Sequence, residues 1–212
     1  MNEPVTLYVF IKNEKAVSLY ERLGFVIVET IKDSRYIMKR DNRKYYAAYE
    51  ERYKTAHENG VSWLSKVSTP IVMEVIDKYK INRQHRMLEI GCGEGRDSQT
   101  VLEHGFPLMA TDISKEAVTY CKQQLPRYSN HFSVLDCLSD RLEEKFDFIF
   151  SIAVVHMLVV DEDRDGFYQF IRNHLNANGI ALICAMGNGE IEIQSDISTA
   201  YTCRKEITNQ AR

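Results

Sequence analysis

The sequence predicts an α/β protein whose larger part is a doubly wound, mostly parallel sheet with helices on both faces. Three observations carry this prediction. From residue 87 onward, strand-like runs alternate with amphipathic helical segments, and such alternation gives parallel strands joined by right-handed crossovers. The run 146–152 (FDFIFSI) is almost entirely apolar, as strands buried on both faces are. The first strand leads directly into a glycine-rich turn and a helix, which is where doubly wound sheets bind ligands.

The elements of this larger part follow from hydrophobic periodicity. Gly105 is expected to end one helix, and Ser114 is expected to cap the next. A Tyr- and Glu-rich helix is expected before them at 45–58, and Thr69-Pro70 starts another that runs to about Tyr79. The expected strands are 87–90, 107–111, 132–136, 147–152 and 180–186, with helices near 96–104, 115–124 and 164–175.

The first forty residues have a different pattern. It predicts a strand at 5–11, a helix at 14–23 with Asn13 as its N-cap, and two further strands at 25–31 and 35–39. The pattern changes at 41–44, so we expect two domains, residues 1–42 and 43–212.

Composition excludes several classes of protein. The 212 residues allow one large domain, or an ordinary domain with an appendage. The net charge is −3 without a long single-sign run, which argues against a nucleic-acid or membrane surface. No apolar run approaches the ~20 residues of a membrane helix, and the N-terminus lacks a signal-peptide pattern. The five cysteines form no CxxC pair, so we expect a cytoplasmic protein with reduced thiols and no metal site.

The glycine-rich turn has the sequence EIGCGEG at 89–95. Glycine permits both the sharp turn and a close approach to a ligand, although a plain strand-to-helix turn would use the same residues. Two acids favour a ligand. Asp112 ends the second strand, where its carboxylate can accept hydrogen bonds from both ribose hydroxyls of an adenosyl group. Asp136 ends the third strand, which places an acceptor near the exocyclic amine of adenine.

The glycine spacing bears on which cofactor binds. A nicotinamide fingerprint, GxGxxG, requires glycine where this sequence has Arg96, whereas the third glycine here is Gly95. The segment resembles motif I of class I S-adenosylmethionine-dependent methyltransferases, in which an acid at the position of Glu89 helps to hold the methionine end. Segments 110–114, 136–137, 146–158 and 175–183 resemble the later motifs in the correct order. The run 95–98 is also similar to the tellurite-resistance and thiopurine branch.

This resemblance implies a Rossmann-like methyltransferase fold, with S-adenosylmethionine as cofactor and a small molecule as methyl acceptor. It places Ile113 against the adenine. A sheet of this family normally adds a helix and an antiparallel hairpin, but 191–212 is polar, so we expect the last hairpin to be lacking. The implied cofactor-binding residues are Glu89, Gly91, Cys92, Gly93, Gly95, Arg96, Asp112, Ile113, Asp136, Cys137 and Ser151.

Methyl transfer from a sulfonium depends mainly on alignment, so few catalytic groups are expected. His156 is the candidate general base, and a structural histidine is the alternative interpretation. Tyr45, Tyr46, Tyr49 and Tyr53 could close over the cofactor or simply pack in the core. Two other functions stay open: a cofactor-binding or interaction module without turnover, and a nicotinamide enzyme, which Arg96 disfavours.

Residues 9–25 closely resemble the last conserved stretch of GNAT acetyltransferases. In that family, the residue at the position of Asn13 lies near the coenzyme A arm. The residue at the position of Tyr20 often acts as the general acid. The resemblance covers only the final strand-helix-strand-strand portion, without the glycine loop that binds pyrophosphate. We therefore expect no acetyl transfer and interpret the segment as the remnant of a fused acetyltransferase. So small a piece is expected to dock on the methyltransferase domain or on a second copy of the chain, giving a homo-oligomer.

Overall fold

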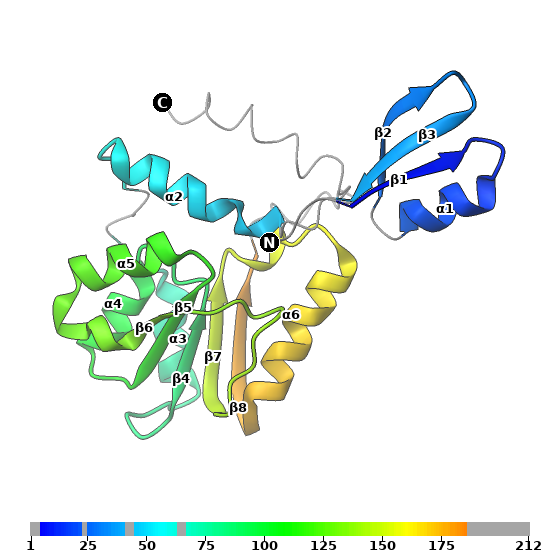
Figure 1. Cartoon of the computed structure of the whole chain (residues 1–212). Coiled ribbons are helices and arrows are strands. Elements are labelled where there is room, and N and C mark those ends of the chain that lie inside the picture. Colours follow the sequence, from blue (N-terminus) through cyan, green and yellow to red (C-terminus); the bar gives the residue numbers. More distant parts are fainter. Residues whose placement is uncertain (1–4, 23–24, 41–44, 63–66, 186–212) are drawn as a thin grey trace. The chain divides into compact units, whose positions relative to one another are not determined.

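The computed structural model describes residues 5–22, 25–40, 45–62 and 67–185. The chain divides into two compact units, with residues 1–47 in the first and residues 48–193 in the second. The first unit holds a small antiparallel sheet and the second a larger parallel one (Figure 1). Two expectations, the boundary at 41–44 and the polar segment 191–212, fall outside the described residues. Within the described ranges, no helix has both the length and the apolar character needed to cross a membrane.

The first unit has the predicted order of elements. Strand β1 (Val5–Phe10) leads through helix α1 (Glu14–Arg22) to the hairpin of β2 (Val26–Ile31) and β3 (Arg35–Arg40). The strands pair antiparallel in the order β1-β3-β2. Asn13 caps α1 as predicted, since its Oδ1 accepts from the amide of Ala16 at 3.2 Å. The core of the unit is small and consists of Val9, Val17, Phe25 and Met38.

The second unit is built on five parallel strands in the order β6-β5-β4-β7-β8. The chain therefore starts in the middle of the sheet at β4, moves outward to one edge, and then crosses to β7 on the other side of β4. This reversal places a topological switch point at the carboxyl end of β4, where open α/β sheets bind ligands. The strands are β4 (Met87–Ile90), β5 (Leu108–Asp112), β6 (Phe132–Val134), β7 (Phe146–Ile152) and β8 (Leu175–Cys184).

Strand β8 begins earlier than the predicted 180–186. It follows helix α6 (Asp161–His174) without an intervening loop, and its pairing with β7 shifts register between Phe146 and Phe148. Asn178 adopts φ +67 inside the shifted stretch, and asparagine tolerates this conformation better than most residues. Periodicity alone could not show this irregularity, because the pairing of β8 with β7 defines it.

Helices cover both faces of the sheet. On one face, α3 (Pro70–Lys78), α4 (Arg96–Glu103) and α5 (Lys115–Gln124) pack on Met87, Phe148 and Phe150. Because side chains alternate along a strand, Leu88 and Ile149 point to the opposite face, and both are also buried. Helix α6 lies beside β8 and buries Phe167 and Phe170 (Figure 1). The remaining elements are the short helices η1 (Tyr45–Ala48), η2 (Pro126–His131) and η3 (Val155–Met157), and helix α2 (Tyr49–Glu58).

Helix α3 is fastened to the start of α4 by one buried carboxylate. Asp97, which is 4% exposed, accepts from the amide of Thr69 at 2.5 Å and from its hydroxyl at 3.0 Å. Thr69 is the N-cap residue of α3, so Asp97 satisfies one of the amides that every helix start leaves without a partner. Arg96 donates to the same carboxylate through Nη2 at 2.9 Å and balances its charge.

This arrangement predicts a stability effect for Asp97→Ala. The substitution leaves the Thr69 amide and the Arg96 guanidinium without this hydrogen-bond acceptor. The free energy of unfolding should therefore fall by about 1–3 kcal/mol. Urea denaturation measures the change. Asp77→Ala, at an exposed position of α3, is the control and should leave the midpoint unchanged. Equal midpoints for the two variants would show that the Asp97 contacts contribute no net stability.

Candidate functional site

The glycine-rich turn lies at the carboxyl end of β4, at the switch point. Gly91, Gly93 and Gly95 all have positive φ, at +78°, +54° and +82°. A Cβ on Gly91 would lie 2.2 Å from Val154 Cγ2, and one on Gly93 would lie 2.8 Å from Tyr53 Oη. Both the backbone conformation and the close packing therefore require glycine in this turn.

The turn uses its own amide groups to hold its shape. The amides of Gly91 and Cys92 both donate to the carbonyl of Thr111, at 2.7 and 2.8 Å. The amide of Gly95 donates to the carbonyl of Cys92 at 2.9 Å. A loop that binds pyrophosphate points such amides at the anion instead. The geometry therefore fits a cofactor that brings no phosphate to this turn, and argues against a nicotinamide dinucleotide.

Asp112 ends β5 and connects the turn to the next helix. Its Oδ2 accepts from the amide of Gly93 at 2.8 Å, and its Oδ1 accepts from the amide of Ser114 at 2.8 Å. Burial raises the pKa of this carboxyl above its usual value, although the two amides oppose the shift. Each carboxylate oxygen accepts more than one hydrogen bond, so Asp112 retains acceptor capacity for a ligand hydroxyl.

Glu89 lies inside the sheet beneath the turn. It is 2% exposed, and the hydroxyl of Ser98 donates to its Oε2. Burial raises the pKa of the carboxyl to about 8. A positive charge brought next to Glu89 would favour its ionised form and return the pKa toward the ordinary range. Glu89 is thus suited to receive a cationic group.

Asp136 and Cys137 follow β6 at the same edge of the sheet. Asp136 Oδ1 accepts from the amide of Leu138 at 3.0 Å and Oδ2 accepts from the Ser139 hydroxyl at 2.9 Å. The amide of Leu135 donates to the carbonyl of Asp112 at 2.9 Å, which joins this segment to the end of β5. Burial raises the pKa of Cys137 to about 12, so its sulfur stays a thiol.

The segment after β7 lies beside the glycine-rich turn. Ser151 is buried and donates from Oγ to the carbonyl of Ile90 at 2.8 Å. Ala153 has φ +59, an uncommon conformation for a residue with a side chain, and it precedes η3. In η3, His156 Nδ1 is buried without a hydrogen-bond partner among the described residues, and burial lowers the pKa of this imidazole below 6.5.

Arg96 and Cys92, two of the predicted cofactor-binding residues, make contacts that support the protein's own structure. The guanidinium of Arg96 lies on Asp97 and Thr69, where it supports the attachment of α3. The thiol of Cys92 is buried, and Cys121 from α5 donates its thiol to the carbonyl of Gly93 at 3.2 Å. The neighbouring Cys121 thiol and burial raise the pKa of Cys92, so it packs the turn and is not a nucleophile.

Helix α2 supplies aromatic residues to the same region. Tyr53 is buried with its hydroxyl above Gly93, and the Tyr49 hydroxyl donates to the sulfur of Met157 at 3.1 Å. Burial raises the pKa of Tyr53 far above its ordinary value of 10, so its hydroxyl stays protonated. These two of the four predicted tyrosines therefore pack against the glycine turn and the segment after β7.

Sequence reasoning missed the charged residues that surround these tyrosines. Glu94, inside the glycine turn, is only 7% exposed, and its carboxylate accepts from His57 Nε2 at 3.0 Å and from the Ser62 hydroxyl at 2.8 Å. Glu50 accepts from the hydroxyl of Ser114 at 2.7 Å. A signal was present, since Tyr49, Tyr53 and His57 are spaced by four residues and share one helix face.

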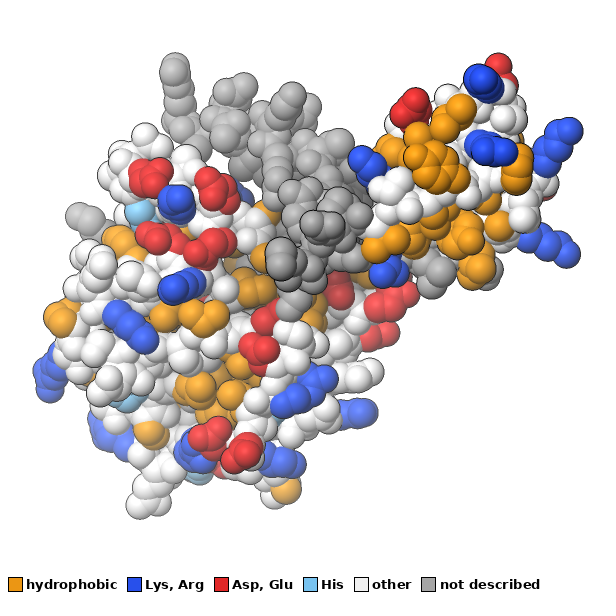
Figure 2. All heavy atoms as spheres, viewed as in Figure 1, with side chains coloured by type: hydrophobic (Ala, Val, Ile, Leu, Met, Phe, Trp, Pro, Cys, Tyr) orange, Lys and Arg blue, Asp and Glu red, His pale blue; other side chains and the backbone are white. Residues whose placement is uncertain are grey.

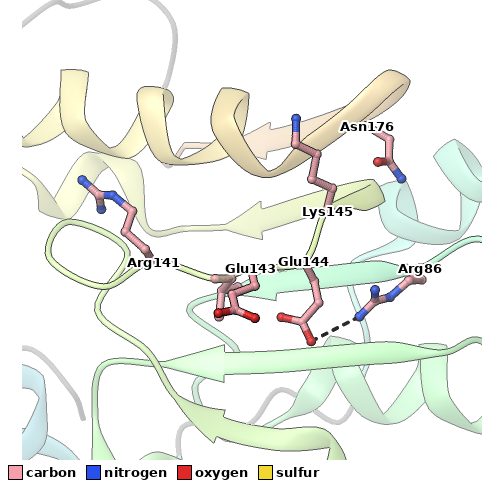
Figure 3. A pocket seen from close by; sticks show the side chains of 7 residues that line it. Arg86, Arg141, Glu143, Glu144, Lys145 and Asn176 are labelled. Carbon is pink, nitrogen blue, oxygen red and sulfur yellow. Dashed lines mark ion pairs between the residues drawn. The ribbon is translucent and has the colours of Figure 1, made fainter.

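A separate hollow of about 710 Å³ lies at the opposite edge of the sheet (Figure 3). Arg86 and Lys145, which immediately precede β4 and β7, place it at the amino ends of the strands. Arg86 pairs with Glu144 at 3.5 Å, and both side chains are about half exposed. This hollow is therefore distinct from the glycine turn and from the acids at the carboxyl ends.

Comparisons with known proteins agree with the geometry of the turn. Residues 88–181, less than half of the chain, match the family model described as a methyltransferase domain. Over 120 residues the chain is 27% identical to the probable S-adenosyl-L-methionine-dependent methyltransferase TehB of Haemophilus influenzae, covering 56% of this chain and 42% of that protein. It is 30% identical over 122 residues to malonyl-[acyl-carrier protein] O-methyltransferase 1 of Ilyobacter polytropus, covering 55% and 44%.

Solved structures show the same fold. The glycopeptide N-methyltransferase MtfA complexed with sinefungin matches with a TM-score of 0.52 at 20% identity, over 60% of this chain and 54% of that chain. CalS10 from Micromonospora echinaspora, an amino pentose methyltransferase, matches with a TM-score of 0.51 at 19% identity, over 67% and 59%. The chain spans less than half the length of the two curated relatives named above. Residues 88–181 thus match a methyltransferase-domain model, are similar in sequence to S-adenosylmethionine-dependent methyltransferases, and have the Rossmann-like fold of the solved structures named above.

Proposed function

We propose that this chain is an enzyme that binds S-adenosylmethionine at the carboxyl ends of β4 and β5 and transfers its methyl group to a small-molecule acceptor. The observation that carries the proposal is the hydrogen bond from the Gly93 amide to Asp112 Oδ2, at 2.8 Å. It brings the glycine turn and the acid that ends β5 to the same side of the switch point. This places a close-approach surface next to an acceptor for hydroxyl groups.

The residues present fit the parts of this cofactor. Glu89, buried beneath the turn, suits the ammonium of the methionine end, and Asp112 suits the ribose hydroxyls. Ile113 and Asp136 follow at the ends of β5 and β6, where the adenine and its amine would be received. S-adenosylmethionine carries no phosphate, which agrees with a turn whose amides donate to protein acceptors, among them the carbonyls of Thr111 and Cys92.

The chain's part in the reaction is mainly positioning. S-adenosylmethionine supplies a methyl group that is already activated on a sulfonium. Alignment of donor and acceptor in a rigid site can contribute roughly 7–11 kcal/mol. Burial lowers the pKa of His156, so its ring is neutral at pH 7, and no hydrogen bond to the described part of the chain occupies Nδ1; the neutral imidazole is suited to take a proton from the acceptor.

A small acceptor is favoured by the charge of the chain. The net charge of −3 offers no broad attraction for nucleic acid. We also propose a cytoplasmic location, because the four cysteines in the described residues are all free thiols. Release of S-adenosylhomocysteine on incubation with thiols, amines, halides and metalloid oxyanions tests turnover. Binding without release for any acceptor class would favour a module without activity.

The small first unit is the proposed oligomer contact. It exposes apolar side chains, among them Tyr8 at 64% and Phe10 at 56%, and Figure 2 shows apolar side chains on the surface of this unit. We propose that it docks on a second copy of the chain. Light scattering coupled to size exclusion reports the mass of the full chain and of a Tyr8→Ser/Phe10→Ser double variant. A monomer at all concentrations in both would reject the proposal.

The first prediction from the proposed function concerns Asp112→Ala. The variant removes the acceptor for the ribose hydroxyls and the partner of the Gly93 amide, so affinity for S-adenosylmethionine should fall at least about tenfold. Isothermal titration calorimetry measures the dissociation constant. Asp147→Ala is a matched control, because Asp147 also accepts from a backbone amide, that of Arg86 at 2.8 Å, but lies at the amino end of β7. Equal dissociation constants in all three proteins would falsify the assignment.

The second prediction compares Gly93→Val with Gly60→Val. Both positions have positive φ, so both variants bear a backbone strain of about 1–2 kcal/mol. Only at Gly93 does the new Cβ meet another group, the Tyr53 hydroxyl, whereas nothing lies within 4 Å at Gly60. Gly93→Val should lose measurable cofactor binding while its circular dichroism stays close to that of the wild type, and Gly60→Val should bind. Normal binding by Gly93→Val would reduce the turn to a structural role.

The third prediction concerns the pH dependence of turnover. A base whose pKa lies below 6.5 is ready to accept a proton at neutral pH and loses that ability only as the pH falls through the lowered value. The rate should therefore hold from pH 8 down to about the ordinary imidazole pKa of 6.5 and decline below it. His156→Gln should lower kcat by about 100-fold or more without changing the cofactor dissociation constant. A kcat equal to that of the wild type would remove His156 from the mechanism.

A further inference from the structure

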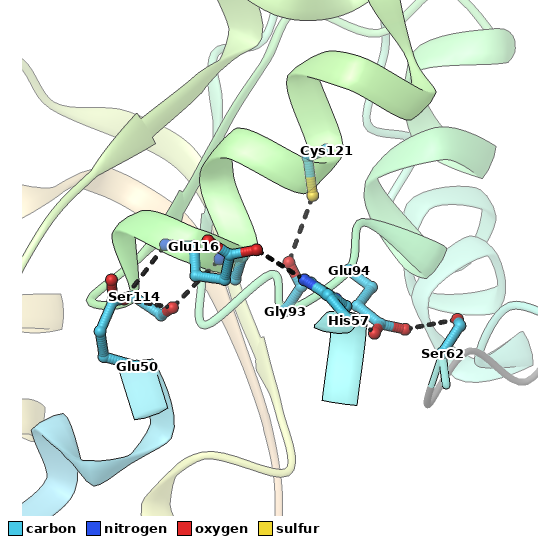
Figure 4. A network of polar contacts seen from close by, with 9 residues as sticks. Glu50, His57, Ser62, Gly93, Glu94, Ser114, Glu116 and Cys121 are labelled. Atoms are coloured by element: carbon cyan, nitrogen blue, oxygen red, sulfur yellow. Dashed lines mark hydrogen bonds and ion pairs between the residues drawn. The ribbon is translucent and has the colours of Figure 1, made fainter. Parts of the chain in front are cut away.

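The imidazole of His57 joins helix α2 to two other elements (Figure 4). Its Nε2 lies 3.0 Å from Glu94 Oε1 in the glycine turn, and its Nδ1 lies 2.9 Å from Glu116 Oε1 in the first turn of α5. The ring also stacks on Tyr120 of α5, with centroids 4.2 Å apart and 18° between the planes. His57 is thus the point at which α2, the glycine turn and α5 meet.

The geometry determines which form of the ring fits. A carboxylate only accepts hydrogen bonds, and a neutral imidazole has one N–H donor. Both contacts can be made together only by the doubly protonated imidazolium. The titratable groups that face the ring are Glu94 from the turn, Glu116 and Tyr120 from α5, and Tyr53 from α2 itself.

The surroundings favour this charged form. Burial opposes it, but the hydrogen bonds to Glu116 and Glu94 outweigh burial and raise the pKa of His57 above its ordinary 6.5. The His57 side chain is 12% exposed and that of Glu94 is 3% exposed, so this pair is shielded from much of the solvent, whereas the Glu116 side chain is 33% exposed.

The N-terminal end of α2 is also held to α5, by hydrogen bonds to Glu50. Glu50 Oε2 accepts from the Ser114 hydroxyl at 2.7 Å and from the amide of Glu116 at 3.1 Å. A carboxylate at the start of α5 also meets the positive end of the helix dipole. With Glu50 and His57 both held, the segment between them is fixed, and this segment carries Tyr53 above Gly93.

The position of Tyr53 gives this arrangement a function. Its hydroxyl lies 2.8 Å from where a Cβ of Gly93 would be, so it covers the part of the turn that a ligand must approach. We propose that His57 is a positioning residue whose imidazolium holds α2 closed over the glycine turn, and that loss of its proton releases the helix. The inference rests on the proposed function in one respect, that the ligand enclosed is S-adenosylmethionine or its product.

The sign of the pH effect follows from the contacts. The stabilisation is complete below pH 6.5 and is lost as the pH rises through the raised pKa of His57. Above that range one ring nitrogen becomes an acceptor that faces a carboxylate, and the contact turns unfavourable. The closed helix should therefore be more protected at pH 6 than at pH 9.

One experiment tests the closure without any ligand. Hydrogen–deuterium exchange of the full chain, corrected for the intrinsic pH dependence of exchange, gives protection factors for α2 at pH 6, 7, 8 and 9. In the wild type, protection should fall by about fivefold or more across this range. His57→Gln should show the low protection at every pH, because glutamine has no charge to lose. His104→Gln, at an exposed histidine after α4, is the matched control and should behave as the wild type.

A second measurement uses S-adenosylhomocysteine as the probe in calorimetric titrations over the same pH range. His57→Gln should bind the probe more weakly than the wild type at pH 6 and with equal affinity at pH 9. Glu116→Gln should likewise make the affinity for the probe depend less on pH. A loss of affinity by the same factor at every pH would indicate a purely structural role and overturn the inference.

The two measurements separate the possible failures. Protection of α2 that depends on pH through His57, together with no binding of the probe, would reject the proposed function and support the closure. Binding of the probe with protection and affinity that do not vary with pH would reject the closure and leave the proposed function standing.

Discussion

The hydrogen bond between the Gly93 amide and Asp112 holds the candidate site together. It joins the turn after β4 to the end of β5, and the second oxygen of the same carboxylate holds the amide of Ser114. Three backbone segments therefore meet at one buried carboxylate. Glycine adopts positive φ without steric cost, and these bonds, together with those to the Thr111 carbonyl, hold the turn in one conformation.

Buried acids recur around this point, and each one connects elements. Asp97 fastens α3 to α4, Glu94 connects the turn to α2, and Glu89 bonds to Ser98 beneath the turn. Burying a carboxylate is costly unless hydrogen bonds or a cation compensate. For Asp97 the cation is Arg96, and for Glu94 it is His57. The compensation differs in kind, because arginine keeps its charge at all physiological pH values whereas histidine does not.

This difference separates the second unit into a part whose charge pairing uses arginine and a part, helix α2, whose charge pairing uses histidine and depends on pH. The sheet and the helices α3, α4 and α5 share one apolar core, and the Arg96–Asp97 ion pair joins α4 to the start of α3. Helix α2 contributes Tyr53 as its one buried residue and depends more on polar contacts with its neighbours. An element with few buried apolar contacts opens at low cost, and lids over ligand sites are drawn from such elements.

The sequence by itself determined the order and kind of the elements. The strands from β4 to β7 lie within a few residues of their predicted ranges, because runs such as 146–152 are apolar throughout and the helices between them have a clear amphipathic period. It also identified the glycine turn and Asp112, because a turn with positive φ favours glycine and an acid at the end of a strand can be read directly from the sequence. The start of β8 was placed too late, because pairing with β7 defines that register.

Only the tertiary structure decided how the charged side chains are paired. Arg96 and Cys92 sit within the glycine motif, yet Arg96 contacts Thr69 and Cys92 packs beside Cys121, and neither partner is near in sequence. His57 and Glu94 are 37 positions apart, and nothing in the local pattern of either predicts their contact. Local propensity is encoded along the chain, whereas the pairing of buried charges depends on which elements the fold brings together.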